Sequence, residues 1–163
     1  MIEANRNNIF VGISQQLLSI EKATDFVNAP ENGATDVFIG KVRNHNLGKE
    51  VNGVSYDAFA PLACNVFKEI CEEAITKFDK RLRCYVEHYH GHLDIGGISV
   101  IIAAGSPHRD ESFKACRYII EELKKRAPIW KQEHYTDGDS EWVQGHALCS
   151  HNSGVDSHSH TAM

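Results

Sequence analysis

The segment from Leu123 to Lys131 constrains the fold more than any other, because a proline divides it. Its sequence, LKKRAPIWK, holds four cations and no acid in a chain whose formal net charge is -5. Pro128 lacks an amide hydrogen, and its ring disfavours helical torsions at Ala127. A helix that arrives from the N-terminal side should therefore end near Arg126.

This break puts Lys124 in a last helical turn and Lys131 on a differently directed segment, so the two lysines can converge on one spot. Two nearby amines can bind an anion, or the charge of one can lower the pKa of the other. Basic residues at a helix C-terminus are also ordinary, because the helix dipole favours them there. The segment alone leaves both interpretations open.

The pattern of apolar residues predicts a mixed α+β domain. We expect strands at 8–13, 35–43, 51–59, 83–90, 97–104 and 142–143, and helices at 19–27, 61–78 and 106–126. The second and third strands should form a hairpin, and the fourth should pair with an apolar, central fifth. The expected buried faces of the two long helices are Leu62, Val66, Ile70, Ala74 and Phe78, and Phe113, Cys116, Ile120 and Leu123.

Composition indicates a single cytosolic domain. A chain of 163 residues, 42% hydrophobic and 24% charged, can bury a proper core. It shows no apolar run near the ~20 residues of a membrane helix and no signal-peptide pattern. Five cysteines without a CxxC pair suggest buried, reduced thiols, and the mild net acidity argues against non-specific nucleic-acid binding. We expect a folded domain over residues 1–149 and a disordered tail over 150–163.

Two further cationic segments accompany the lysines. Lys41 and Arg43 end a predicted strand, where alternation places them on one face. His108 and Arg109 follow Ser106-Pro107 at a predicted helix N-terminus, where free amides favour an anion. Arg109 offers a forked donor for phosphate, and His108 can move a proton near neutral pH. Three such segments in an acidic chain indicate a pocket for a phosphorylated or otherwise anionic substrate.

A competing signal is the sequence His88-Tyr89-His90-Gly91-His92. In an extended chain its three imidazoles share a face, which is one way to bind a divalent metal. No cysteine or carboxylate at a suitable spacing completes the set, and Gly91 suggests a turn. We therefore expect a polar strand edge here, and neither a metal nor a cofactor.

Three motifs give the chain a resemblance to a known family. The runs 40–48 (GKVRNHNLG), 106–109 (SPHR) and 124–131 (KKRAPIWK) resemble, in order and spacing, the large, catalytic subunit of molybdopterin synthase, the MoaE family. The similarity covers roughly residues 8–143. It implies an α/β-hammerhead fold with an additional small antiparallel sheet.

The resemblance also implies a sulfurtransferase of molybdenum cofactor biosynthesis. In this family a small ubiquitin-like carrier subunit threads its C-terminal Gly-Gly thiocarboxylate into the large subunit. Sulfur passes to cyclic pyranopterin monophosphate, and two transfers build the dithiolene of molybdopterin. Two large subunits form a central dimer within a heterotetramer. The motifs place the family's catalytic lysines on Lys124 and Lys131, its substrate-holding residues on Lys41, Arg43, His108 and Arg109, and its pocket phenylalanine on Phe38.

We hypothesise that Lys124 acts closest to the transferring sulfur, as an acid when protonated or as a base when neutral. Crowding by Arg43, Arg109 and Lys131 should lower the pKa of Lys124. Lys131 should mainly orient the pterin or its phosphate. The family often has an arginine where this chain has His146, so that role is not transferred.

Two alternatives from other classes stay open at this point. The first is a non-catalytic adaptor that binds a ubiquitin-like protein and receives its acidic tail. The second is a phosphate-ester hydrolase that uses the histidine strand and a metal. Binding of a pterin phosphate without the partner would exclude a pure adaptor, and metal analysis would test the hydrolase.

Overall fold

The computed structural model describes residues 2–144 of the chain. The elements follow one another as β1 (Ile2–Arg6), β2 (Ile9–Ser14), α1 (Ile20–Val27), β3 (Ala34–Lys41), β4 (His45–Asn46), β5 (Lys49–Ala58), α2 (Ala60–Lys77), β6 (Arg83–Tyr89), β7 (Gly91–Asp94), β8 (Ile98–Ser106), α3 (Arg109–Arg126), β9 (Ile129–Tyr135), β10 (Gly138–Asp139) and β11 (Val143–Gln144). The expected boundary at residue 149, the tail, His146 and Cys149 lie outside the described residues. Within them, no helix is both long and apolar enough to cross a membrane.

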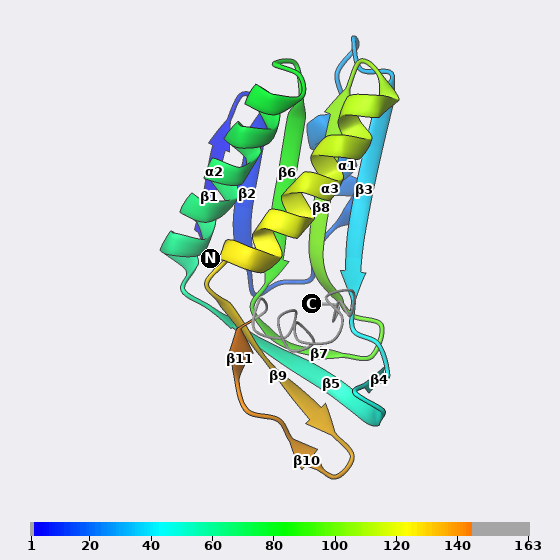
Figure 1. The fold of residues 1–163 in the computed structure, drawn as a ribbon, viewed down its shortest axis with the longest axis vertical. Helices are drawn as coiled ribbons and strands as arrows, with labels where there is room; N and C mark the ends of the chain where they lie inside the picture. The colour runs from blue at the N-terminus through cyan, green and yellow to red at the C-terminus, as the bar shows by residue number, and fades with distance from the viewer. Residues whose placement is uncertain (1, 145–163) are drawn as a thin grey trace, which may run out of the picture.

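The strands form two sheets, one above the other in Figure 1. The first has the order β1-β2-β6-β8-β3, in which β2 and β6 are parallel and the other neighbours antiparallel. The second is antiparallel, with the order β10-β9-β5-β4 and with β7 and β11 added to β5 and β9. The mixed α+β fold with an additional antiparallel sheet is confirmed.

The three helices cover the first sheet on both faces. α2 and α3 lie side by side on one face (Figure 1), above a core that contains Phe67, Ile102 and Ile119. α1 packs on the other face, over a smaller core with Phe10 and Tyr85. Because helices cover both of its faces, β8 is apolar nearly throughout, as expected of a central strand.

The long helices occur where expected, and the predicted buried faces are confirmed in part: Ile70 and Ala74 are buried in α2, and Cys116 and Leu123 in α3. α2 leaves Leu62 47% exposed, because a four-residue spacing overshoots the repeat of 3.6 residues and drifts around the helix. In α3, Ser112 turns inward through a hydrogen bond to Asp36, and Phe113 is 58% exposed. The buried residues are Ala63, Cys64, Phe67, Ile70, Cys71 and Ala74 in α2, and Ser112, Ala115, Cys116, Ile119 and Leu123 in α3.

The predicted hairpin between residues 35–43 and 51–59 does not form. β3 pairs with β8 in the first sheet, whereas β5 joins β4, β7 and β9 in the second. A register shift between Gly40 and Lys41 ends β3, and the Val42 amide then donates to the Gly97 carbonyl (2.9 Å). The connection is longer than a tight turn, so it did not fix the pairing of the two strands. The other expected pair, β6 with β8, is confirmed.

Other local expectations are confirmed in part. The Ser19 hydroxyl accepts from the Lys22 amide and caps α1. The buried thiols are confirmed for the four cysteines within the described residues, and Cys71, Cys84 and Cys116 are free. The last helix begins at Arg109 rather than at Ser106, which belongs to β8 and donates from Oγ to the carbonyl of His108 (2.6 Å).

Candidate active site between the two sheets

The proline break places Lys124 and Lys131 on either side of a sharp change of direction. α3 ends at Arg126, as predicted, and Ala127 has extended torsions (φ -75, ψ 134) ahead of Pro128. β9 then starts directly below the end of the helix (Figure 1). Lys124 is half-buried in the last helical turn, and Lys131 is buried near the start of the strand.

Lys131 is a buried cation on the inner face of the second sheet. Its side chain shares that face with Tyr56, its partner in β5. Its Nζ lies 3.8 Å from Oε1 of Glu133, two residues further along β9. Lys131 is 5% and Glu133 6% exposed. A buried ammonium requires such a counter-charge, because an unpaired charge removed from water is strongly destabilising.

Glu133 connects Lys131 to β4 and to the loop between β3 and β4. The side-chain amide of Asn46 donates to Oε1 of Glu133 and lies 3.3 Å from the Tyr135 hydroxyl. Nη2 of Arg43 lies 3.5 Å from Oδ1 of Asn46, at the long limit of a hydrogen bond. A polar chain therefore runs from exposed Arg43 through buried Asn46 and Glu133 to Lys131. Sequence reasoning missed Asn46 and Glu133, although an acid two residues after a strand lysine shares its face.

Tyr56 and His88 form an uncharged wall beside Lys131. Burial, the largest cause, raises the pKa of Tyr56 well above its usual value. The His88 ring meets the Tyr56 ring edge-on at 5.0 Å between centroids. Burial lowers the pKa of His88 to about 4, and the charge of Lys131 acts in the same direction. Both side chains are therefore neutral at pH 7, and sequence reasoning had assigned neither to this site.

The end of β3 joins the same cluster. The Tyr56 hydroxyl is hydrogen-bonded to Ser99, whose Oγ donates to the Gly40 carbonyl (3.2 Å). A Cβ at Gly40 would lie 2.6 Å from Cγ1 of Val100, so the approach of β3 to β8 requires glycine. Phe38, two residues earlier in β3, is 36% exposed and accessible to a ligand.

Lys41 and Arg43 both lie exposed at this end of β3. The expected strand alternation does not relate them, because β3 ends at Lys41. The contact of Arg43 with Asn46 is what ties it to the Lys131 cluster.

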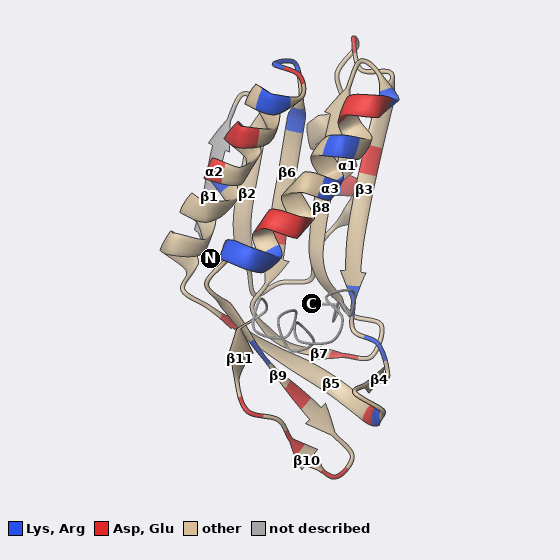
Figure 2. Ribbon diagram, viewed as in Figure 1, with Lys and Arg blue, Asp and Glu red and all other residues tan. Residues whose placement is uncertain are grey.

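His108 and Arg109 lie at the other end of the molecule. Ala34 pairs with Ser106, and Lys41 with Ile98, so the length of β3, about 23 Å, separates the two cationic ends. Figure 2 shows the corresponding blue segments at opposite ends of β3 and α3. Within one chain they do not form the single pocket expected from the sequence. Arg109 therefore cannot crowd Lys124 of its own chain.

The other cations of the basic segment serve the packing of α3. Arg126 donates from Nη1 and Nη2 to Glu73 of α2 (2.8 and 3.0 Å), and Tyr118 also donates to Glu73. These bonds raise the pKa of Arg126 and lower that of Glu73. Lys125 lies 3.6 Å from Glu122 on the same helix. Both cations are thus paired with acidic side chains, Arg126 with Glu73 and Lys125 with Glu122.

The histidine strand does not gather its three imidazoles. His88 points into the core, and its Nδ1 lies 2.8 Å from the Tyr89 carbonyl. His90 contacts Asp57 at 3.1 Å, and His92 contacts Asp94 at 3.2 Å. Among residues 2–144 no group of three or more histidine, cysteine or acidic residues is arranged to hold a metal ion.

Known proteins are similar to this chain in sequence and in fold. The family described as MoaE protein matches residues 13–126. A molybdopterin synthase catalytic subunit from Synechococcus elongatus is 44% identical over 149 residues, which cover 91% of this chain and 89% of that protein. The crystal structure of molybdopterin synthase from Staphylococcus aureus has a TM-score of 0.77 and 33% identity, covering 80% of this chain and 94% of that one.

A more distant structure shows the fold alone. It comes from a complex of subunits 1 and 2 of the molybdopterin-converting factor of Helicobacter pylori, with a TM-score of 0.63 and 23% identity. It covers 79% of this chain and 87% of that one. The family match spans most of the chain, and the relative from Synechococcus elongatus aligns with 91% of it. The chain therefore belongs to the MoaE family, the catalytic subunits of molybdopterin synthase.

Proposed function

We propose that the chain transfers sulfur from the C-terminal thiocarboxylate of a small ubiquitin-like carrier subunit to cyclic pyranopterin monophosphate, forming the dithiolene of molybdopterin. The observation that carries the proposal is the pair of lysines around Pro128, one half-buried and one buried beside Glu133. Both reactants are anionic, through a cyclic phosphate and a thiocarboxylate, so a site with fixed cations fits them.

Lys124 acts closest to the transferring sulfur. Its ammonium, at the negative end of the α3 dipole, polarises the thiocarboxylate or protonates a leaving oxygen, and its free amine can act as a base. Lys131 is held by Glu133 and by the neutral Tyr56 wall, which suits a residue that orients the pterin or its phosphate. Exposed Phe38 offers a ring on which the pterin can stack.

Lys41 and Arg43 hold the phosphate from the end of β3, where both side chains are exposed. The carrier subunit is the partner, and the occurrence of this fold in a two-subunit complex supports that assignment. The buried, free thiols of Cys71, Cys84 and Cys116 support a cytosolic location.

A single-turnover assay tests these roles. Purified chain is mixed anaerobically with thiocarboxylated carrier and cyclic pyranopterin monophosphate, and the dithiolene product is read after oxidation to a fluorescent pterin. Lys124→Ala should abolish transfer, and Lys131→Ala should chiefly weaken substrate binding. Lys125→Ala is the matched control, because Lys125 is exposed and faces Glu122.

Three results would change the assignment. Near-normal transfer by Lys124→Ala would remove Lys124 from the chemistry. Unchanged affinity with abolished turnover in Lys131→Ala would move Lys131 into the chemistry. No product from the wild-type chain, with carrier still bound, would favour the adaptor.

His108 and Arg109 act on the site of a second copy of the chain. They lie about one strand length from Lys41 in their own chain, yet the family motifs assign both groups to one substrate. In a symmetric dimer each site can combine Lys124 of one copy with Arg109 of the other. Mixing Lys124→Ala with Arg109→Ala chains should then restore about a quarter of wild-type activity, because half of the dimers carry one intact site. A mixture as inactive as its components would contradict the shared site.

A further inference from the structure

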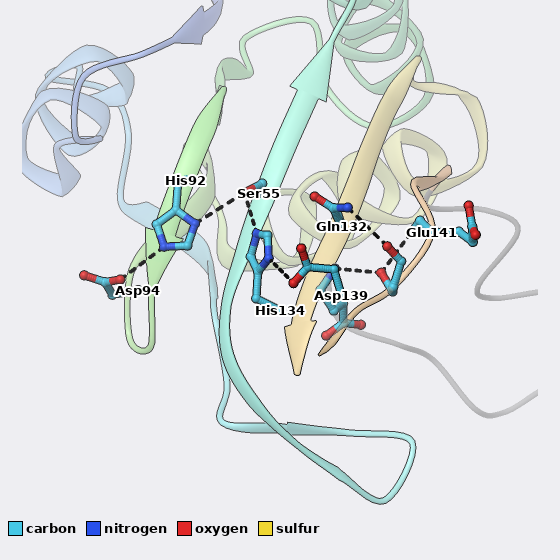
Figure 3. Close-up of polar contacts among 9 residues, drawn as sticks. Ser55, His92, Asp94, Gln132, His134, Asp139 and Glu141 are labelled. Carbon is cyan, nitrogen blue, oxygen red and sulfur yellow. Dashed lines mark hydrogen bonds and ion pairs between the residues drawn. The ribbon is translucent and has the colours of Figure 1, made fainter. Parts of the chain in front are cut away.

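A second cluster of reactive side chains lies on the outer face of the second sheet, away from Lys131. Five side chains form a line across the strands (Figure 3): Asp94, His92, Ser55, His134 and Asp139. Strand alternation puts Ser55 on the face opposite Tyr56, which faces the site described above. The family motifs and the sulfur-transfer site do not use this cluster, and of its members only His92 belongs to the histidine sequence considered above.

Ser55 lies between two histidines that each also contact a carboxylate, and the shorter distances point to His134 as its base. Nδ1 of His134 lies 2.8 Å from Oδ1 of Asp139, so it carries the proton and donates it to the carboxylate. Nε2 of His134 is then a free acceptor, 2.7 Å from Oγ of Ser55. Enzymes with a nucleophilic serine have the same arrangement, in which the histidine contacts the serine hydroxyl through Nε2 and a carboxylate through Nδ1.

The second histidine completes the surroundings of the hydroxyl. Nδ1 of His92 lies 3.3 Å from Oγ of Ser55, and its Nε2 lies 3.2 Å from Asp94. When protonated, His92 donates to Oγ while His134 accepts from it, which favours negative charge on the oxygen. The ring centroids of His92 and His134 are 5.2 Å apart. A Cβ at Gly53 would lie 2.9 Å from Cε1 of His92. Glycine at this position therefore allows the His92 ring to approach.

The carboxylate of Asp139 is held in place by the hairpin that carries it. Asp139 pairs directly with His134 across β10 and β9. The next residue, Ser140, accepts two hydrogen bonds. The Glu133 amide donates to its Oγ (2.8 Å), and Nε2 of Gln132 donates to its carbonyl oxygen (3.2 Å). These bonds, drawn in Figure 3, fix the short segment against β9.

The cluster is accessible. Ser55 is half-buried, and the side chains of His134 and Asp139 are 24% and 55% exposed. A nearby pair gives an internal comparison, since His90 contacts Asp57 at 3.1 Å without a serine in the arrangement. His134 thus joins an exposed carboxylate to the hydroxyl of a half-buried serine.

We propose that Ser55 is a nucleophile that accepts an acyl group from activated esters, with His134 as its base and Asp139 as the group that orients the base. Oγ attacks the acyl carbon and its proton passes to Nε2 of His134. The bond to the leaving alkoxide breaks, and that oxygen takes the proton from the imidazolium. The products are an acyl ester on Ser55 and an alcohol. Water then hydrolyses the ester through the same base and releases a carboxylic acid.

Turnover should be slow compared with the first step. Ser55 lies in the middle of β5, which pairs with β7 on one side and β9 on the other. The backbone groups around Ser55 are therefore engaged in hydrogen bonds between strands. Such amides are not available to stabilise the oxyanion of a tetrahedral intermediate. The acylated enzyme should therefore accumulate, and covalent labelling is the sharper measurement.

The test uses the full-length chain and a fluorophosphonate probe, which bonds to a nucleophilic serine and releases fluoride. We expect one adduct per chain, mapped by mass spectrometry to Ser55 and absent from Ser55→Ala. His134→Gln and Asp139→Asn should each slow labelling by about 100-fold or more, because each impairs the base. His90→Gln, the matched control, should label at the wild-type rate.

A parallel measurement separates this site from the sulfur-transfer site. Ser55→Ala should keep wild-type sulfur transfer, and Lys124→Ala should keep wild-type labelling. Three outcomes would overturn the proposal: no adduct on the folded chain, an adduct at another residue, or labelling of His134→Gln at the wild-type rate when its circular dichroism matches that of the wild type.

Discussion

Replacing Glu133 with glutamine should destabilise the protein strongly, although the change is nearly isosteric. The charges of Lys131 and Glu133 are 3.8 Å apart, which corresponds to about 4 kcal/mol at an effective dielectric constant of about 20. Glutamine keeps an oxygen that can accept from Asn46, so the loss is mainly that of the counter-charge. After relaxation we expect the free energy of unfolding to fall by about 3 kcal/mol, which would lower the Tm by about 10 °C.

The assay is urea unfolding at one protein concentration near pH 7.5, for the wild type, Glu133→Gln, Lys131→Met and the double variant. If the two charges stabilise each other, the double-mutant cycle should give a coupling energy of about 2 kcal/mol or more. Glu141→Gln removes an exposed acid of the same region and should change stability by less than about 0.5 kcal/mol. A coupling energy below about 0.5 kcal/mol would refute the idea that Glu133 is the counter-charge of Lys131.

Three further predictions concern stability. The pKa of His88 is lowered from 6.5 to about 4, so the unfolded chain binds an extra proton between these values and stability should fall by about 3 kcal/mol as pH drops through this range. Urea titrations should show this slope reduced in His88→Phe, and equal slopes would contradict it. Arg126→Met should lower the free energy of unfolding by about 1 kcal/mol, because Arg126 donates two hydrogen bonds to a carboxylate of α2. Arg117→Met breaks only an exposed i,i+4 pair and should lower it by less than about 0.5 kcal/mol. Equal losses in thermal unfolding would contradict this difference. Gly105→Ala places a Cβ 2.3 Å from the Val27 carbonyl oxygen, so thermal unfolding should show a loss of about 2 kcal/mol or more, and wild-type stability would show that α1 can move away.

Strand β9 shows why part of the site was not apparent in the sequence pattern. Its inward positions are Ile129, Lys131 and Glu133, so two of the three are charged. A strand is recognised by apolar residues on its inner face, and here the charges of Lys131 and Glu133 occupy that face. The charges are tolerated because they neutralise each other and because Asn46, from another strand, completes the hydrogen bonding.

The sequence by itself determined the features that depend on neighbouring residues. Pro128 ended α3 at Arg126, Ser19 capped α1, and the three motifs indicated the family. Steric exclusion and capping act over a few residues, so a local pattern is sufficient to predict them.

Only the tertiary structure decided which distant residues meet. It placed Asn46 against Glu133 and Ser55 between His92 and His134, and it put Arg109 a strand length from Lys41 in the same chain. These relations depend on strand partners and on the register between strands. Register is set by how apolar faces pack across the whole domain, and the local sequence of one strand does not specify it.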